Sequence, residues 1–361
     1  MKRIQYLDGH RGIAILLVVF YHLFSRWNEI LPYGDSFSNI VFEQGFLGVQ
    51  LFFLISGFVI LMTLDRENSL PSFMYKRWLR LFPAMLICTA FILFTSDIFN
   101  SRPAGEVNLL DVAPGLLFIE PNWLEKLIGV PFSSLEGAFW SLYVEFKFYL
   151  IAAFLYFVVK DKKLTFLLFG LFLLSIISQF LNQFYDSKII YVVYALSTHL
   201  SLSFFGWFAA GTAFYLFYKG QDYKWLFCGF LMAVVSSILL YKDNYQTMIS
   251  AVAISIFFTL SFVSVLIQRL LQNRLLIFIG FVSYPLYLLH ENMMISMSID
   301  MSENFQRLPM LIPPLIAIAV VIAISYFISK YLEVPAKNYC KFACEKLMKL
   351  LIQVKKRYST N

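Results

Sequence analysis

Residues 47–64 have the sequence LGVQLFFLISGFVILMTL, in which no residue is charged. A helix needs about 20 consecutive, mostly apolar residues to cross the hydrocarbon core of a bilayer. This run, part of a longer apolar stretch over residues 39–64, therefore predicts a membrane-spanning helix. The fold class of the whole chain depends on how often such runs recur.

The composition indicates a membrane protein throughout. Hydrophobic residues make up 60% of the 361 residues and charged residues only 14%, and the mean hydropathy is +0.71. A soluble domain carries about a quarter charged residues, so the deficit indicates that much of the surface faces lipid. The net charge is +7, but the basic residues fall between apolar runs rather than along one stripe. Membrane topology explains this pattern, and nucleic acid is not expected as a partner.

Apolar runs of spanning length recur along the chain. They lie near residues 8–27, 39–64, 79–98, 138–159, 164–182, 190–218, 223–241, 246–267, 275–297 and 310–332. The segment 190–218 is long enough to contain a re-entrant piece. We predict an all-α integral membrane protein with about ten transmembrane helices in one domain, residues 1–336.

The distribution of lysine and arginine predicts the orientation, because cytoplasmic loops carry an excess of both. With the N-terminus inside, the cytoplasmic group is Lys2, Arg3, Arg11, Arg66, Lys76, Arg77, Arg80, Lys160, Lys162, Lys163, Lys219, Lys224, Arg269, Arg274 and the basic tail. The opposite side receives Arg26, Arg102, Lys126, Lys188, Lys242 and Arg307. Both termini are therefore predicted to be cytoplasmic.

Two segments lie outside the predicted spans. Residues 99–137 form the longest outer loop, rich in proline and with an apolar patch around Phe118 and Trp123. We expect an interfacial helix there or a cap over a binding site. Residues 337–361 are predicted to form a basic amphipathic helix that lies on the anionic cytoplasmic leaflet.

The four cysteines do not form a disulfide framework. Cys340 and Cys344 lie one helical turn apart, but no histidine or second cysteine pair accompanies them. Small residues on a helix face explain them better than metal ligands do. We expect no metal site.

Ionisable residues inside spans are costly and usually face an internal cavity. The first predicted span carries Arg11 and His22. Eleven residues amount to three turns plus roughly 20°, so both side chains point the same way, with roughly 16 Å between them along the axis. An anion held at Arg11 could extend an arm of pantetheine length towards His22, and histidine is the usual general base for a hydroxyl. Taken alone, the pair is explained better by snorkelling of Arg11 and packing of His22.

Arg77 and Arg80 share a helix face at i and i+3, which is typical of a phosphate or pyrophosphate clamp. The alternative is an ordinary positive-inside flank.

Glu145 and His290 are predicted to lie at a depth similar to that of His22. Glu145 could orient a catalytic histidine or the acceptor hydroxyl. An equally favoured alternative is a structural ion pair with Lys147 or Arg26. Because these three ionisable residues come from three separate spans and are predicted to lie at one depth, we favour a functional site.

Several motifs together resemble the acyltransferase 3 family of bacterial integral membrane O-acyltransferases. They are Leu7-Asp8-Gly9-His10-Arg11-Gly12 followed by His22, Gly48 through Phe58, Arg77-x-x-Arg80-x-x-Pro83, Trp140-Ser141-Leu142-x-x-Glu145-x-x-Phe148-Tyr149, Ser283-Tyr284-x-x-Tyr287-Leu288-x-His290 and Glu333-x-Pro335. They run in family order across nearly the whole chain. His10, Gln50 and Lys147 stand where the family more commonly has Leu, Asp and Gln, which puts the acceptor specificity in doubt.

The resemblance implies a ten-helix, multi-pass protein of the bacterial inner membrane. It implies an acyl-coenzyme A donor, commonly acetyl-coenzyme A, taken from the cytoplasm, and a carbohydrate acceptor such as lipopolysaccharide O-antigen, exopolysaccharide or another envelope glycan. On this basis we assign catalysis to His22, Glu145 and His290, and donor binding to Arg11, Arg77 and Arg80. Substrate binding is assigned to Trp140, Ser141, Tyr284 and Tyr287.

The expected mechanism is direct attack by an acceptor hydroxyl that His22 deprotonates. A covalent acyl-histidine or acyl-tyrosine relay is the mechanistic alternative, because donor and acceptor come from opposite sides. The competing function is a transporter or flippase of a glycan or lipid-linked precursor, since charges at membrane depth also line substrate pathways. A receptor or scaffold is a weaker third option. The acceptor, the acyl group and the oligomeric state stay open.

Overall fold

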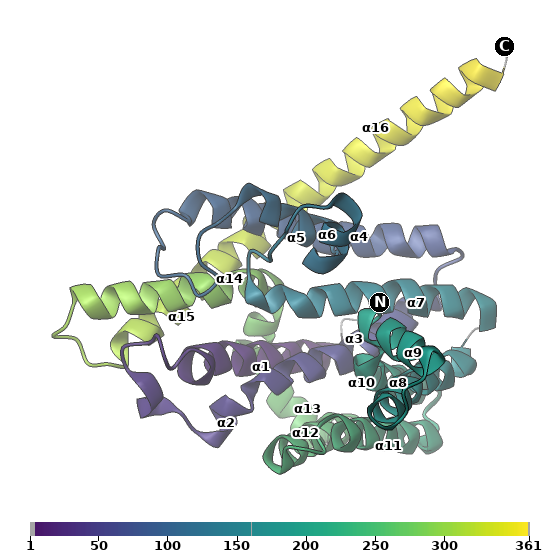
Figure 1. Ribbon diagram of the computed structural model, residues 1–361, viewed down its shortest axis with the longest axis horizontal. Helices are drawn as coiled ribbons and strands as arrows, with labels where there is room; N and C mark the ends of the chain where they lie inside the picture. Colours follow the sequence, from purple (N-terminus) through teal and green to yellow (C-terminus); the bar gives the residue numbers. More distant parts are fainter. Residues whose placement is uncertain (1–3, 160, 360–361) are drawn as a thin grey trace.

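The computed structural model describes residues 4–159 and 161–359, and in these ranges the regular elements are all helical (Figure 1). The α-helices, in chain order, are α1 Gln5–Tyr21, α2 Ile40–Glu43, α3 Gly48–Leu64, α4 Leu70–Thr95, α5 Val112–Leu117, α6 Pro121–Ile128, α7 Trp140–Val159, α8 Asp161–Phe184, α9 Lys188–His199, α10 Phe205–Gly220, α11 Tyr223–Leu240, α12 Tyr245–Leu260, α13 Val265–Leu271, α14 Arg274–Asn304, α15 Ile312–Phe327 and α16 Glu333–Ser359. The prediction of an all-α protein is confirmed.

The number of candidate spans agrees with the prediction. Among the residues described, eight helical segments are long and apolar enough to cross a membrane, and ten are if each of two bent pairs is one span. The bent pairs are α9 with α10, at 66°, and α12 with α13, at 103°. The first break falls inside the segment for which a re-entrant piece was anticipated. The span predicted over 246–267 is bent, because Ser264 caps a new helix by accepting a hydrogen bond from the Ile267 N–H.

The third span starts earlier than predicted. Helix α4 begins at Leu70, not at residue 79. Ser69 caps it by accepting a hydrogen bond from the Ser72 N–H, and Pro71 lies in the first turn, where it needs no hydrogen-bond partner. Hydropathy placed the start too late because Arg77 and its basic neighbours interrupt the apolar run. Those residues lie within the helix.

Helices α1 and α14 approach one another unusually closely. A Cβ at Gly12 would lie 2.3 Å from the Leu276 carbonyl oxygen, and one at Gly280 would lie 2.0 Å from the Asp8 carbonyl oxygen. Small residues permit such backbone contacts between membrane helices. The contact brings the ionisable residues of α1 next to the polar motif of α14.

The segment between α4 and α7 contains helices α5 and α6, which fold against the bundle. Phe118 is buried and stacks on Phe146 of α7, with ring centroids 5.3 Å apart. Trp123 is partly exposed. Helices therefore form in this loop, whereas their position at the membrane interface and a capping role stay predictions.

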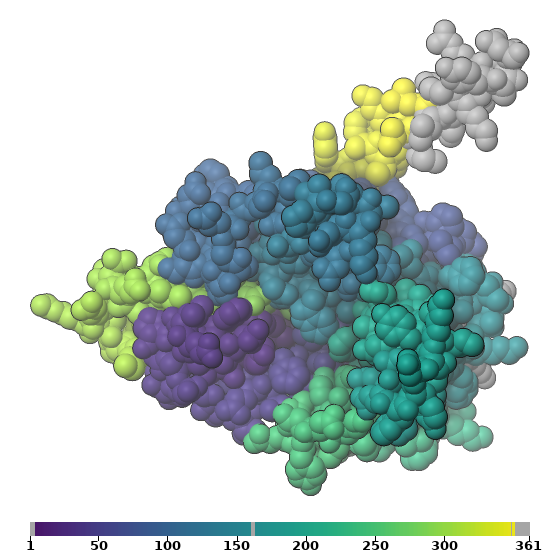
Figure 2. Space-filling model, viewed as in Figure 1, coloured from purple at the N-terminus to yellow at the C-terminus, as the bar shows by residue number. Residues whose placement is uncertain are grey.

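Helix α16 continues from α15 through a π-helical turn, Ile328–Leu332, and extends away from the bundle (Figures 1 and 2). It packs against α4 at its start. The tail predicted over 337–361 is helical as far as Ser359, and residues 360–361 lie outside the described residues. No break occurs at the expected boundary after residue 336. Its position on a membrane surface stays a prediction.

Candidate active site

A cavity of about 500 Å³ lies among helices α1, α3, α4, α7, α14 and α16. This volume is in the usual range for ligand sites. Its charged and hydroxyl-bearing lining residues are Asp8, Arg11, Ser56, Arg77, Arg80, Ser141, Glu145, Tyr149, Ser283, Tyr284, Tyr287, Glu333 and Lys337. We call it the arginine cavity. Its lining, as far as the described residues show, takes nothing from α8–α13.

All three arginines assigned to donor binding line this cavity. Arg11 donates a 3.0 Å hydrogen bond to Asp8, and the buried Arg77 donates one to the hydroxyl of Thr63. Arg80 is exposed, and it forms no hydrogen bond or ion pair with other described residues. Its guanidinium is therefore free to bind an anion.

The start of α16 supplies two lining residues that the sequence analysis did not assign to the site, Glu333 and Lys337. Lys337 was counted as part of a surface tail. Because α16 continues directly from the last span, its first turns border the cavity instead. The motif Glu333-x-Pro335 was the signal that could have placed this segment at the site.

Glu145 lies on α7 in the cavity wall, among neutral donors. Its Oε1 accepts hydrogen bonds from the Ser56 hydroxyl and from the Tyr149 hydroxyl, each at 2.5 Å. Two hydroxyl donors hold the carboxylate in the cavity lining. The structure thus places Glu145 with the arginines rather than with the two histidines.

The alternative of a structural ion pair for Glu145 is wrong in both of its forms. The Lys147 ammonium instead pairs with Glu120 at 2.6 Å, which ties α7 to the start of α6. Arg26 is exposed and lies over the ring of Trp27, 4.8 Å from its centroid. Neither cation neutralises Glu145.

The hydroxyls of Ser141 and Tyr287 form the far end of the arginine cavity. The Tyr287 hydroxyl donates to the Ala138 carbonyl at 2.7 Å, so it accepts the 2.7 Å hydrogen bond from Ser141. Tyr284 also lines the cavity and donates to a backbone carbonyl of α4. Trp140, assigned to substrate binding, does not line the cavity; it is 41% exposed.

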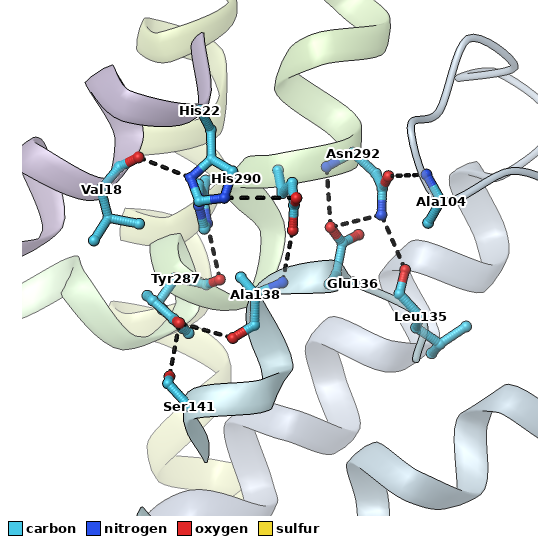
Figure 3. Close-up of polar contacts among 11 residues, drawn as sticks. Val18, His22, Ala104, Leu135, Glu136, Ala138, Ser141, Tyr287, His290 and Asn292 are labelled. Carbon is cyan, nitrogen blue, oxygen red and sulfur yellow. Dashed lines mark hydrogen bonds and ion pairs between the residues drawn. The ribbon is translucent and has the colours of Figure 1, made fainter. Parts of the chain in front are cut away.

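His22 and His290 come together directly beyond Tyr287 (Figure 3). His22 begins a π-helical turn at the end of α1, and its Nδ1 lies 2.8 Å from the Val18 carbonyl oxygen and 3.2 Å from His290 Nε2. His290 Nδ1 lies 2.9 Å from the Tyr287 carbonyl oxygen. The cavity lining reaches Tyr287 but includes neither histidine.

These contacts determine the tautomers of the neutral rings. His290 Nδ1 faces a carbonyl oxygen, so it carries the proton and leaves Nε2 as an acceptor. His22 Nδ1 then lies between two acceptors, Val18 O and His290 Nε2, and must carry the proton of its own ring. The unprotonated nitrogen of the neutral His22 ring, which can accept a proton, is therefore Nε2.

A carboxylate that the sequence analysis missed completes this arrangement. Glu291 Oε1 lies 3.5 Å from His22 Nε2, and its Oε2 accepts a 2.6 Å hydrogen bond from the Ala138 N–H. We call His22, His290 and Glu291 the histidine cluster. Its signal in the sequence was an acidic residue directly after His290 inside an apolar span.

A second missed carboxyl, Glu136, lies just before α7. It accepts hydrogen bonds from the Asn292 backbone N–H at 3.0 Å and the side-chain amide at 2.8 Å (Figure 3). Burial, reinforced by the charge of Glu291, raises the pKa of Glu136 to about 8. The charge of Arg102, 3.7 Å away, lowers the pKa of Glu136 but does not offset the effect of burial. Glu136 is therefore mostly protonated at neutral pH.

Comparison with known proteins gives a consistent picture. The family model described as "Acyltransferase domain" matches residues 4–330. A Staphylococcus aureus (strain COL) protein named as a candidate O-acetyltransferase is 27% identical over 336 residues, which covers 80% of this chain and 50% of that protein. The peptidoglycan O-acetyltransferase OatA of Listeria monocytogenes is 30% identical over 191 residues, 48% of this chain and 28% of that protein.

A protein of the Acidianus two-tailed virus, named as a candidate acetyltransferase, is 26% identical over 292 residues, 78% of this chain and 80% of that protein. The chain spans about half the length of the staphylococcal relative. None of the solved structures matches it.

Proposed function

Because the chain belongs to the acyltransferase domain family, we propose that it is a membrane-bound O-acetyltransferase. It moves an acyl group, commonly acetyl, from cytoplasmic acyl-coenzyme A to a hydroxyl of a cell-envelope carbohydrate, and it resides in the bacterial inner membrane. The observation that carries the proposal is a cavity with arginines at one end whose other end, at Tyr287, adjoins His22 and His290.

The arginines are proposed to hold the phosphates of the donor. Guanidinium groups bind phosphate oxygens through paired, charge-assisted hydrogen bonds. Arg80 lines the cavity and is exposed, whereas Arg11 and Arg77 are each held by a hydrogen-bond partner. An extended pantetheine arm bound there spans roughly the 16 Å that an 11-residue separation on α1 provides between Arg11 and His22.

In the proposed reaction, His22 Nε2 removes the proton from the acceptor hydroxyl. The oxygen attacks the thioester carbonyl, the carbon–sulfur bond breaks, and the coenzyme A thiolate leaves with the proton that His22 releases. Glu145, fixed by Ser56 and Tyr149, orients the reacting groups from the cavity side. In the alternative mechanism, the acyl group is transferred first to His22 and from there to the acceptor hydroxyl.

A carbohydrate acceptor is supported by one relative, the Listeria protein, whose name specifies peptidoglycan O-acetylation. O-antigen and exopolysaccharide offer the same chemistry, a hydroxyl on a ring carbon. A transport function is less well supported, because the two bent helix pairs that would suit a substrate pathway contribute nothing to the described cavity lining.

The test is transfer of labelled acetyl from acetyl-coenzyme A to envelope glycan by the purified protein. We expect His22→Ala to lower turnover by about 10²- to 10⁴-fold, the usual contribution of a general base. His199→Ala is the matched control, because His199 is exposed and outside the site. Undiminished turnover by His22→Ala would remove His22 from the mechanism, and no transfer by the wild type to any envelope glycan would overturn the proposed function.

A further inference from the structure

Glu291 is an acidic residue in a membrane-spanning helix, and its side chain is only 6% exposed. Ionisable groups at such positions are costly and seldom persist without a role. Both carboxylate oxygens have defined neighbours: one faces His22 Nε2 at 3.5 Å, and the other accepts the Ala138 N–H at 2.6 Å. The hydrogen bond from the backbone fixes the direction in which the free oxygen points.

The nitrogen that Glu291 faces is the one that changes its protonation state during the proposed reaction. In the neutral ring His22 Nε2 is bare, since Val18 O and His290 Nε2 hold the proton on Nδ1. When Nε2 takes a proton from a hydroxyl, the ring becomes a cation directly opposite a carboxylate. An attraction that exists only in the charged state favours the transition state over the ground state.

We infer that Glu291 is the positioning residue of His22: it holds a negative charge opposite Nε2 and stabilises the positive charge that the ring acquires when it deprotonates the acceptor. This inference rests on the proposed function, because it assumes that His22 is the base. It assigns to Glu291 no contact with the donor, since Glu291 is not part of the arginine cavity lining.

The absence of a side chain at Gly137 leaves space for the Glu291 carboxylate. A Cβ at Gly137 would lie 2.9 Å and 3.0 Å from the two Glu291 oxygens, closer than Cβ atoms come to such neighbours. Any side chain at Gly137 would therefore displace Glu291 from His22. A purely structural carboxylate that only held the Ala138 N–H would not need to lie opposite His22 as well.

The experiment compares Glu291→Gln with the wild type in acetyl transfer under saturating and limiting acetyl-coenzyme A. Glutamine keeps the shape and can still accept the Ala138 N–H, but it lacks the charge. We expect kcat to fall on the order of 10²-fold, the effect of removing one preorganised electrostatic stabiliser of the transition state, with KM for the donor unchanged. A wild-type kcat, or a loss confined to KM, would overturn the inference.

A second pair of variants tests the same contact from the backbone side. Gly137→Ala should lower kcat because it displaces the carboxylate, whereas Gly170→Ala, with no atom within 4 Å of its added Cβ, should not. In a Glu291→Ala background the Gly137→Ala change should add little, since nothing is left to displace. Additive losses would contradict the inference.

The outcomes separate this inference from the proposed function. If His22→Ala abolishes transfer while Glu291→Gln does not, only the role of Glu291 fails. If His22→Ala leaves transfer intact, the proposed base itself fails, and the inference fails with it. If Glu291→Gln unfolds at a lower temperature than wild type, Gly137→Ala becomes the deciding variant.

Discussion

The arginine cavity and the histidine cluster lie side by side in one helix bundle, yet they are built in opposite ways. The cavity is an open space whose cations include Arg80, which is exposed and forms no ion pair with the described residues. The cluster is closed, and each of its three side chains faces a defined hydrogen-bonding or charged neighbour. An exposed cation without an ion-pair partner suits a ligand that binds and is released. Polar groups held in place by their neighbours suit catalysis.

The backbone of Ala138 joins the two regions. Its carbonyl accepts from the Tyr287 hydroxyl at the end of the cavity, and its N–H donates to Glu291 in the cluster. We therefore predict that substitutions in the arginine cavity alter donor binding and that substitutions in the histidine cluster alter the chemical step.

After His22→Ala, the largest effect is expected from His290→Ala. Its Nε2 is one of the two acceptors of the His22 Nδ1 proton, so its loss leaves the ring held by the Val18 carbonyl alone and less firmly placed. Misplacing the base should lower kcat by about 10²-fold, with KM for acetyl-coenzyme A within a factor of about two. Steady-state kinetics beside His199→Ala measure both values, and an increase in KM alone would remove His290 from the chemistry.

Arg77→Ala should have the opposite signature. Losing one charge-assisted hydrogen-bonding group costs about 1.5–3 kcal/mol, which is roughly a 10- to 100-fold weaker Kd for acetyl-coenzyme A. The turnover at saturating donor should change little. Calorimetric titration of the detergent-solubilised protein checks the affinity. Unaltered binding would mean that the buried guanidinium is structural, held by Thr63 and not by a ligand.

Glu136→Gln is expected to change stability rather than activity. The pKa of Glu136 is raised to about 8 in the folded protein, above the unfolded value, so its stabilising contribution is full below the unfolded pKa and is lost as the pH rises towards 8. Glutamine cannot ionise. The Tm of the variant relative to wild type should therefore increase by a few degrees between pH 5 and pH 9. Equal Tm differences at both values would refute the shift.

The smallest effect is expected from Trp140→Ala. Trp140 is 41% exposed and does not line the cavity itself; its ring packs against Phe53, which does, and against Phe204. Donor affinity and turnover should both stay within about twofold of wild type, as for most exposed positions. Its neighbour Ser141, which bonds Tyr287, is the contrast. A large loss in Trp140→Ala would extend the site beyond the described cavity.

Much of the fold follows from hydropathy, and the misses have physical causes. The first, second and fourth spans agree with the apolar runs to within a few residues, apart from the start of the second. The start of α4 was missed because Arg77 lies inside a helix that shelters it from lipid. The bend after α12 was missed because Ser261 and Ser264 interrupt an apolar run without any proline or glycine.

Site residues were predicted where helical spacing puts two of them on one face of a helix. They were missed where a side chain is held by a backbone group from a distant segment. Arg11, Arg77 and Arg80 were placed together by helical spacing and by resemblance. Glu291 depends on the Ala138 N–H and on the space at Gly137. No periodicity in the sequence predicts that the backbone of the 3-10 turn Gly137–Phe139 contacts the middle of α14.

The most direct test of the account separates donor binding from transfer in the same samples. Equilibrium binding of acetyl-coenzyme A and single-turnover transfer are measured for wild type, Arg80→Ala and His22→Ala. We predict that Arg80→Ala binds about tenfold more weakly but transfers normally once saturated. His22→Ala should bind like wild type and transfer at least about 10²-fold more slowly. Transfer at the wild-type rate by His22→Ala, or wild-type affinity in Arg80→Ala, would contradict the division between the two regions.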